Sequence, residues 1–243
     1  MQTASITRKV HKWLFLFVGI QALLWTLSGV YMVVMDLDFI HGDHLVKNLR
    51  EPLPETRGDL FPSGELLRDR DGVRSLQLKA LRGQPFYVLR DSEGTHLFDA
   101  RSGSEISPLD QQTAVALAEH YYNGDRKATS AELITDNPPT ELQSRALPLW
   151  RVNFDDRYGT SFYVDPATGA LVTRRHHYWR AFDFFWMLHI MDYEERADIH
   201  NPLLLTITLV SLTAVIAGLI LLFYSFGRRR PGIATDPVTG GAQ

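Results

Sequence analysis

Histidine side chains beside two long apolar segments are the feature of this sequence most suited to chemistry. His189 and His200 lie in the stretch AFDFFWMLHIMDYEERADIHN (residues 181–201), and His44 ends the motif HGDH (residues 41–44). A neutral imidazole nitrogen binds metal ions and haem iron. We expect His44, His189 and His200 to lie at one membrane level. We predict that an outer site draws its ligands from them, with iron held by His189 and His44.

Each histidine also has an interpretation without a ligand role. For His189 it is a hydrogen bond to a lipid headgroup or a neighbouring carbonyl, and for His41 it is a place in a loop. His11 lies about 30 Å from the outer histidines, at the other end of the first apolar segment. An inner haem would need His11 from two chains; otherwise His11 is a basic interfacial residue. His176 and His177 are predicted to mark a solvated strand end.

The elements that must position these side chains begin with two uncharged segments, residues 13–35 and 202–225. At a rise of ~1.5 Å per residue each helix spans about 35 Å, more than the hydrocarbon core of about 30 Å. We predict two transmembrane helices, the first retained as an anchor because its apolar run exceeds that of a signal peptide. Basic residues lie on the N-terminal side of the first segment and on the C-terminal side of the second. By the positive-inside rule, they place both termini in the cytoplasm and the region between the two segments outside. These residues are Arg8, Lys9, Lys12, Arg228, Arg229 and Arg230.

Composition excludes several classes of function. The region between the helices holds more acidic than basic residues, which argues against a nucleic-acid partner. The chain has no cysteine, which excludes disulfides, thiol catalysis, iron–sulfur clusters and covalently attached haem. Any haem in this protein is therefore expected to be non-covalent, held by His or Met.

Between the two apolar segments, residues 86–106 and 150–172 repeat one pattern. Each has an alternating strand, an acidic turn, Gly-Thr, a second strand and Asp-x-x-Ser/Thr-Gly, which predicts a β-hairpin. Helical spacing of apolar residues predicts a helix before the second hairpin, and a shorter helix and a strand precede the first. The residues on the predicted helix face are Ala114, Leu117, Ala118 and Tyr121. We expect two small α+β units, each a helix on an antiparallel sheet, without a catalytic motif.

A further helix is expected from about residue 178, immediately before the second apolar segment. Its aromatic residues and His189 share one face, which is typical of an amphipathic helix at a membrane interface. The residues on this face are Phe182, Phe185, Trp186, His189 and Tyr193. Asn201 or Asp198 is predicted to cap the second membrane helix, with Pro202 in its first turn.

The hairpin pattern resembles the PepSY domain, and the flanking segments resemble those of PepSY-associated transmembrane proteins. The positions that carry the second resemblance are Arg8, His11, Trp13, Ser28, Gly29, Trp186, His189, Asn201 and Gly218. The resemblance implies a bacterial inner-membrane protein linked to iron uptake. Larger members resemble ferric-siderophore reductases that hold b-type haem among four or more helices. A chain with two helices would need to dimerise to build such a site.

These observations predict an α+β protein with two transmembrane helices flanking a periplasmic domain of two PepSY-like units. The expected segments are a cytoplasmic N-terminus (1–12), two transmembrane helices (13–35 and 201–226), the periplasmic domain (36–177), the interfacial helix (178–200) and a cytoplasmic tail (227–243). The preferred function is a homodimeric haem b protein that passes electrons from quinol or a separate reductase to periplasmic ferric iron or a ferric-siderophore. One alternative is a non-enzymatic membrane-anchored binding or regulatory module. Another is a periplasmic metal sensor that uses His41 and His44.

Overall fold

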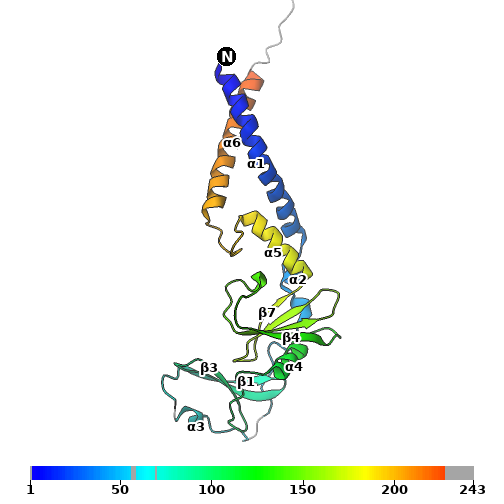
Figure 1. Ribbon diagram of the computed structural model, residues 1–243, viewed down its shortest axis with the longest axis vertical. Helices are drawn as coiled ribbons and strands as arrows, with labels where there is room; N and C mark the ends of the chain where they lie inside the picture. Colours follow the sequence, from blue (N-terminus) through cyan, green and yellow to red (C-terminus); the bar gives the residue numbers. More distant parts are fainter. Residues whose placement is uncertain (1, 56–58, 69, 228–243) are drawn as a thin grey trace, which may run out of the picture.

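Two long helices stand at one end of an elongated molecule and two β-sheets at the other (Figure 1). The computed structural model describes residues 2–55, 59–68 and 70–227. Helices α1 (Gln2–Val34) and α6 (Pro202–Gly227) pack against each other. The segments Phe15–Val34 and Pro202–Phe223 are long and apolar enough to cross a membrane, and only 11% and 6% of the most apolar stretch of each is buried. A core helix of a soluble protein would be mostly buried, so the exposure of both segments is compatible with a membrane environment. The prediction of two long apolar helices is confirmed.

The first unit of the β domain is a three-stranded antiparallel sheet with a short helix. Strands β1 (Ser75–Leu81), β2 (Gln84–Arg90) and β3 (Thr95–Asp99) pair in sequence order. Helix α3 (Ser63–Leu67) places Leu66 in a small core with residues of the sheet. The buried partners of Leu66 are Tyr87, Leu89, Phe98 and Ala100. The short helix and strand predicted before the first hairpin are therefore present.

The second unit is a four-stranded antiparallel sheet covered by a longer helix. Strands β4 (Ala128–Ile134), β5 (Leu149–Phe154), β6 (Ser161–Val164) and β7 (Leu171–Arg175) again pair in sequence order, and η2 (Thr140–Leu142) follows β4. Helix α4 (Gln111–Tyr121) contacts β4, β5 and β6. Its buried residues are Ala114, Leu117, Ala118 and Tyr121, the face predicted from spacing.

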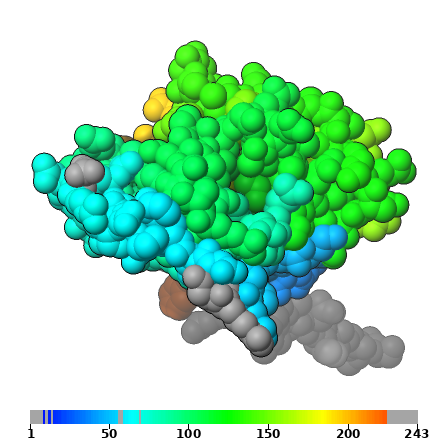
Figure 2. Space-filling model, turned by 90° about the horizontal axis from the view of Figure 1, so that it is seen from below, coloured from blue at the N-terminus to red at the C-terminus, as the bar shows by residue number. Residues whose placement is uncertain are grey.

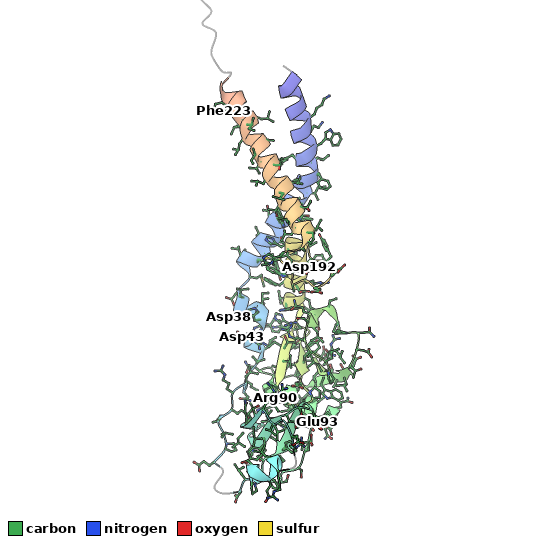
Figure 3. The ribbon with its side chains drawn as sticks, turned by 90° about the vertical axis from the view of Figure 1, so that its left-hand side faces the viewer. Asp38, Asp43, Arg90, Glu93, Asp192 and Phe223 are labelled. Carbon is green, nitrogen blue, oxygen red and sulfur yellow. The ribbon has the colours of Figure 1, made fainter. Side chains whose placement is uncertain are left out.

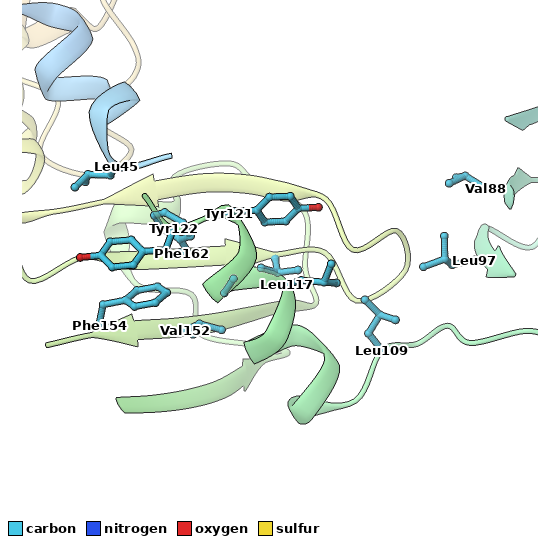
Figure 4. Close-up of a cluster of buried hydrophobic side chains, with 12 residues drawn as sticks. Leu45, Val88, Leu97, Leu109, Leu117, Tyr121, Tyr122, Val152, Phe154 and Phe162 are labelled. Atoms are coloured by element: carbon cyan, nitrogen blue, oxygen red, sulfur yellow. The ribbon is translucent and has the colours of Figure 1, made fainter. Parts of the chain in front are cut away.

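One apolar core joins the two units. Val88 and Leu97 of the first sheet belong to the same buried cluster as Leu117 of α4 and Phe162 of β6 (Figure 4). Burying one such side chain contributes about 1.5–3 kcal/mol, so the shared cluster favours a fixed arrangement of the units. Seen from the end away from α1 and α6, the units form one continuous surface (Figure 2).

The repeated Asp-x-x-Ser/Thr-Gly segments form similar turns in the two units. Asp99 accepts hydrogen bonds from the backbone of the next residues through Oδ1, and Asp165 does the same. Gly103 and Gly169 have φ of 73° and 68°, a region that glycine adopts readily. These turns confirm the prediction of two antiparallel sheets built around equivalent hairpins.

Helix α5 (His177–Ile190) connects the β domain to the long helices. It packs against the outer end of α1 and against α2 (Leu37–His41), which is followed by η1 (Asp43–Leu45). The ring of Tyr31 lies 4.7 Å from that of Phe185, so the predicted amphipathic face packs on α1. The helix ends at Ile190, ten residues before the expected end, where Met191 has φ of 54°. Residues 191–201 form an irregular loop.

Helix α6 begins as the sequence predicts. Asn201 Oδ1 accepts a hydrogen bond from the backbone N–H of Leu204 at 2.8 Å, and Pro202 is the first helical residue. An N-cap of this kind satisfies a backbone donor that has no partner inside the helix. Of the two capping residues considered, Asn201 therefore has this role.

Candidate functional site

His189 is held against α1 by a serine. Its Nδ1 lies 2.9 Å from Ser28 Oγ, and Ser28 Oγ lies 2.8 Å from the carbonyl oxygen of Leu24. A serine hydroxyl has one hydrogen, and the carbonyl can only accept it. When this hydrogen serves the Leu24 carbonyl, Nδ1 of His189 is the donor to Ser28 Oγ. Trp25 Nε1 donates to the backbone oxygen of His189 at 2.7 Å, which fixes the end of α5 on the same helix.

This hydrogen bond determines which nitrogen of His189 can bind iron. With the hydrogen on Nδ1, a neutral imidazole carries its lone pair on Nε2, and Nε2 has no hydrogen-bond partner among the described residues. A Cβ built on Gly29 would lie 3.9 Å from His189 Cε1, so the Cε1 edge of the ring lies beside α1 at Gly29. A metal-binding histidine typically donates its other ring N–H to a neighbouring acceptor, as His189 does. His189 therefore has the ring environment of a metal-binding imidazole.

His44 lies at the opposite end of α5. Its ring stacks on Phe39 with centroids 4.6 Å apart and lies 5.9 Å from the ring of His176. His176 precedes the 14-residue helix α5 and His189 is its penultimate residue, so at ~1.5 Å per residue they are about 20 Å apart. Within one chain His44 and His189 therefore do not approach each other, because the length of α5 separates them.

The structure brings His200 closer to His189. Asn201 Nδ2 donates to the backbone oxygen of Ile190 at 2.9 Å, so residues adjacent to both histidines are hydrogen-bonded. The His200 side chain is exposed, and its backbone N–H donates to Asp198 Oδ1. His11 is in α1, about 25 Å along the helix from Ser28, and its side chain lies outside the described residues.

His176 is buried, contrary to the prediction of a solvated strand end. Its Nε2 lies 3.1 Å from the carbonyl oxygens of Phe39 and Ile40 and donates to them, while Nδ1 has no partner. Burial lowers the pKa of His176, and the neighbouring His44 lowers it further. Partial desolvation of the stacked ring and the charge of Arg157 lower the pKa of His44. Both rings are therefore neutral at pH 7, and His176 joins α2 to α5.

Two further histidines pair with carboxylates, whereas the side chains of His41 and His177 are exposed. His96 Nδ1 lies 2.7 Å from Glu105, and His120 bonds Glu51. Within residues 2–55, 59–68 and 70–227, no group of three or more His, Cys, Asp or Glu side chains is arranged to hold a metal ion. A metal ion bound by His41 and His44 would therefore need further ligands from outside the described part of this chain.

A cluster of arginines on the other face of α5 has no counterpart in the sequence predictions. Arg180 pairs with Glu141 at 2.6 Å, and Arg196 pairs with Asp183. The arginines come from several elements, so no local spacing indicates them. We call Arg145, Arg151, Arg175, Arg180 and Arg196 the arginine cluster. A cavity of about 250 Å³ lies among its members Arg151, Arg180 and Arg196.

The fold and its helices define a class: a mixed α/β protein with two antiparallel sheets and two helices able to cross a membrane. The chain matches no family model, no curated protein and no solved structure in comparisons with known proteins. The PepSY resemblance therefore remains a prediction from motifs, and the proposals below depend mainly on geometry.

Proposed function

We propose that this protein is a membrane-anchored haem b protein that passes electrons outward to a ferric iron complex. The observation that carries the proposal is the His189–Ser28 hydrogen bond, because it leaves Nε2 of His189 free to bind iron. Bound haem would supply one-electron transfer between its ferric and ferrous states. His189 would hold the iron, Ser28 would orient the imidazole, and Trp25 would fix the end of α5.

The membrane is the proposed environment of α1 and α6. Side chains along both helices are exposed, including Phe17 at 69% and Phe223 at 79%, although they are strongly apolar. Exposure on this scale is stable only if lipid or another protein covers it. The basic residues at the outer ends favour cytoplasmic termini, with the β domain in the periplasm of a bacterial inner membrane.

A second copy of the chain is part of the proposal. Each chain offers His189 as a ligand with an open Nε2, and His44 lies at the far end of α5. A six-coordinate haem would then take its second ligand from His189 or His200 of another chain. The exposed apolar surfaces of α1 and α6 are available for such a contact.

The acceptor and the donor follow from the resemblance to ferric-reductase-like proteins. A ferric complex or ferric-siderophore would bind outside, and quinol or a separate reductase would supply electrons. Reductase activity requires turnover measurements, and no described residue has an assigned catalytic role.

The test is a reduced-minus-oxidised absorbance spectrum of the full chain purified from haem-replete cells. We expect b-type bands that His189→Ala removes. The matched control is His41→Ala, which removes an exposed imidazole and should leave the bands unchanged. A colourless wild-type protein, or full haem content in His189→Ala, would refute the proposal.

The second candidate is a non-enzymatic binding module, and one cavity favours it. About 300 Å³ of space lies between the first sheet and α4, lined largely by apolar side chains. These include Leu81, Phe86, Leu97, Ile106, Leu109 and Leu117. A colourless protein that binds an apolar ligand or peptide here would favour this function over electron transfer.

A further inference from the structure

The arginine cluster holds more positive charge than its carboxylates neutralise. Five guanidinium groups lie around the buried carboxylates of Glu141 and Asp183, and Glu132 faces Arg151 across the β4–β5 pair. Electrostatic contacts link Arg145 to Arg175 and Arg151 to Glu141, so these charges belong to one network. Arginine is effectively always protonated in proteins, so five positive charges face three carboxylates and the cluster carries an excess of two.

Burial makes this excess energetically significant. Arg175 is 5% exposed, and its guanidinium lies 3.7 Å from the centroid of the Trp179 ring. Burial, followed by repulsion from Arg145, lowers the pKa of Arg175 to about 10. A buried positive excess is relieved by an anion, and guanidinium groups bind phosphate with paired, charge-assisted hydrogen bonds.

Donors remain free beside the cavity. Arg196 Nε is buried and has no hydrogen-bond partner among the described residues, although Nη1 of the same guanidinium pairs with Asp183. Arg151 makes one side-chain hydrogen bond, from Nε to Asn153 Oδ1 at 3.1 Å. Both residues line the cavity of about 250 Å³, together with Arg180 and Trp179. The cavity is half open to solvent, and its lining includes the guanidinium-bearing residues Arg151, Arg180 and Arg196.

The position of the cavity indicates the kind of anion. Asp183 and Arg180, which line the cavity, are residues of α5. Phe182 of the same helix contacts Tyr31, which lies near the C-terminal end of the apolar segment Phe15–Val34 of α1. Exposed apolar side chains lie close by in sequence, with Phe184 one helical turn beyond Arg180 and Ile199 in the same loop as Arg196. A ligand with an anionic head and apolar tails matches both surfaces.

We propose that the arginine cluster binds the phosphate of an anionic phospholipid of the outer leaflet, with its acyl chains along the apolar residues beside α5. The proposal rests on membrane anchoring but is independent of haem. Inorganic phosphate shares the headgroup chemistry, and the tails distinguish the lipid from it.

The test is native mass spectrometry of the full chain in detergent, titrated with phosphatidylglycerol, phosphatidylcholine or inorganic phosphate. We expect saturable binding of phosphatidylglycerol, about tenfold or more tighter than phosphatidylcholine, which carries no net charge. Arg151→Gln should weaken phosphatidylglycerol binding about tenfold, because it removes a charged donor without breaking an ion pair. Arg90→Gln, at an exposed end of β2 far from the helices, is the matched control (Figure 3).

Because Arg151→Gln could alter folding, the double variant Asp183→Asn/Arg196→Gln provides a second measurement. It removes a buried pair together, and it should also lose selectivity for phosphatidylglycerol. Equal binding of both lipids, unchanged binding by both variants, or saturation by inorganic phosphate alone would overturn the proposal. Alkaline carbonate extraction tests membrane anchoring separately, and the absorbance spectrum tests haem, so each failure is distinguishable.

Discussion

Ser28 Oγ and His189 Nδ1 lie 2.9 Å apart although 161 positions separate the residues in sequence. Ser28 is fully buried and donates its own hydrogen to the preceding turn of α1. The serine therefore acts as an acceptor for the imidazole and sets its tautomer. Through this contact the C-terminal part of the first apolar helix positions the His189 ring.

Replacing Ser28 by alanine should weaken haem binding without removing it. The imidazole of His189 would lose its acceptor, and loss of such an outer partner typically lowers metal affinity about 10- to 100-fold. The measurement is haem titration followed by absorbance. Thr26→Ala is the matched control, because Thr26 also bonds the preceding turn of α1 but is exposed. Equal affinities of the two variants would exclude the orienting role of Ser28.

The orientation of the chain can be tested without background labelling, because the sequence has no cysteine. Glu93→Cys lies in an exposed turn of the β domain, and Lys9→Cys lies near the start of α1. In spheroplasts we expect a membrane-impermeant maleimide to label Glu93→Cys only. Labelling of Lys9→Cys should require disruption of the membrane. The reverse pattern would invert the proposed topology.

The sequence predicted the elements whose signals are local. The buried face of α4, the turns at Asp99 and Asp165, and the cap at Asn201 each depend on side chains a few positions apart. The partner of the aromatic face of α5 was not predictable in this way. Phe185 suits a lipid interface and a helix surface equally, and only the tertiary structure selects Tyr31.

The arrangement of the candidate histidines was not predictable from local signals, for the same reason. His189 was identified by its residue type and place, but its separation from His44 depends on the direction of α5. His176 follows two arginines and looked solvated, whereas its ring is buried because it bonds the end of α2. The arginine cluster combines several elements, so neither its charge excess nor its cavity has a local signal.

Stability should fall as the pH drops below about 6.5, because of His176. The pKa of this buried ring is lowered from its ordinary value of 6.5, so the unfolded chain takes up a proton that the folded chain resists. The associated stability is present above pH 6.5 and is lost as the pH falls toward the lowered pKa. Carboxylates with lowered pKa values, such as Glu51, act only below about pH 4.5.

The measurement for His176 is the thermal unfolding midpoint of the full chain in detergent between pH 7.5 and 5.5. His176→Gln keeps a donor for the α2 carbonyls but does not titrate, so its midpoint should depend less on pH. His41→Gln, with an exposed ring, should behave like the wild type. An unchanged pH dependence in His176→Gln would assign the effect to other groups.

Glu141 should be important for stability because it neutralises the arginine cluster. Its carboxylate accepts from Arg180 at 2.6 Å and from the hydroxyl of Tyr163, and it is 8% exposed. Glu141→Gln leaves the cluster with Asp183 as its buried carboxylate and should lower the free energy of unfolding by about 3 kcal/mol. Denaturant unfolding of the full chain in detergent measures this change.

The control for Glu141 is Asp125→Asn. The Asp125 side chain is 95% exposed and lies 3.9 Å from Arg126, so the expected change is below about 0.5 kcal/mol. A loss under about 1 kcal/mol in Glu141→Gln would show that its charge is not needed to hold the cluster together.

Asp192 should determine the order of the loop that carries Arg196 and His200. Its Oδ1 accepts backbone N–H groups of Glu194 and Glu195, and its Oδ2 accepts those of Ala197 and Asp198 (Figure 3). These bonds, led by that from Asp198, lower the pKa of Asp192, so their contribution is present above pH 3.8 and is lost as the pH falls. Asparagine has one side-chain oxygen, so in Asp192→Asn two backbone donors would face an NH₂ group.

We expect Asp192→Asn to destabilise the loop by about 2 kcal/mol, which corresponds to roughly 30-fold faster amide hydrogen exchange in residues 194–198. Exchange in β5 and β6 should not change, because the β domain has its own core. Asp198→Asn is the matched control, because among the described residues the Asp198 carboxylate accepts one backbone hydrogen bond, from the N–H of His200. Because the loop holds Arg196 beside Asp183, the variant should also weaken phosphatidylglycerol binding. Trp186 also packs against this loop, and its Nε1 donates to the Arg196 carbonyl at 3.1 Å. Unchanged exchange in Asp192→Asn would mean that the contact with Trp186 is sufficient to order the loop.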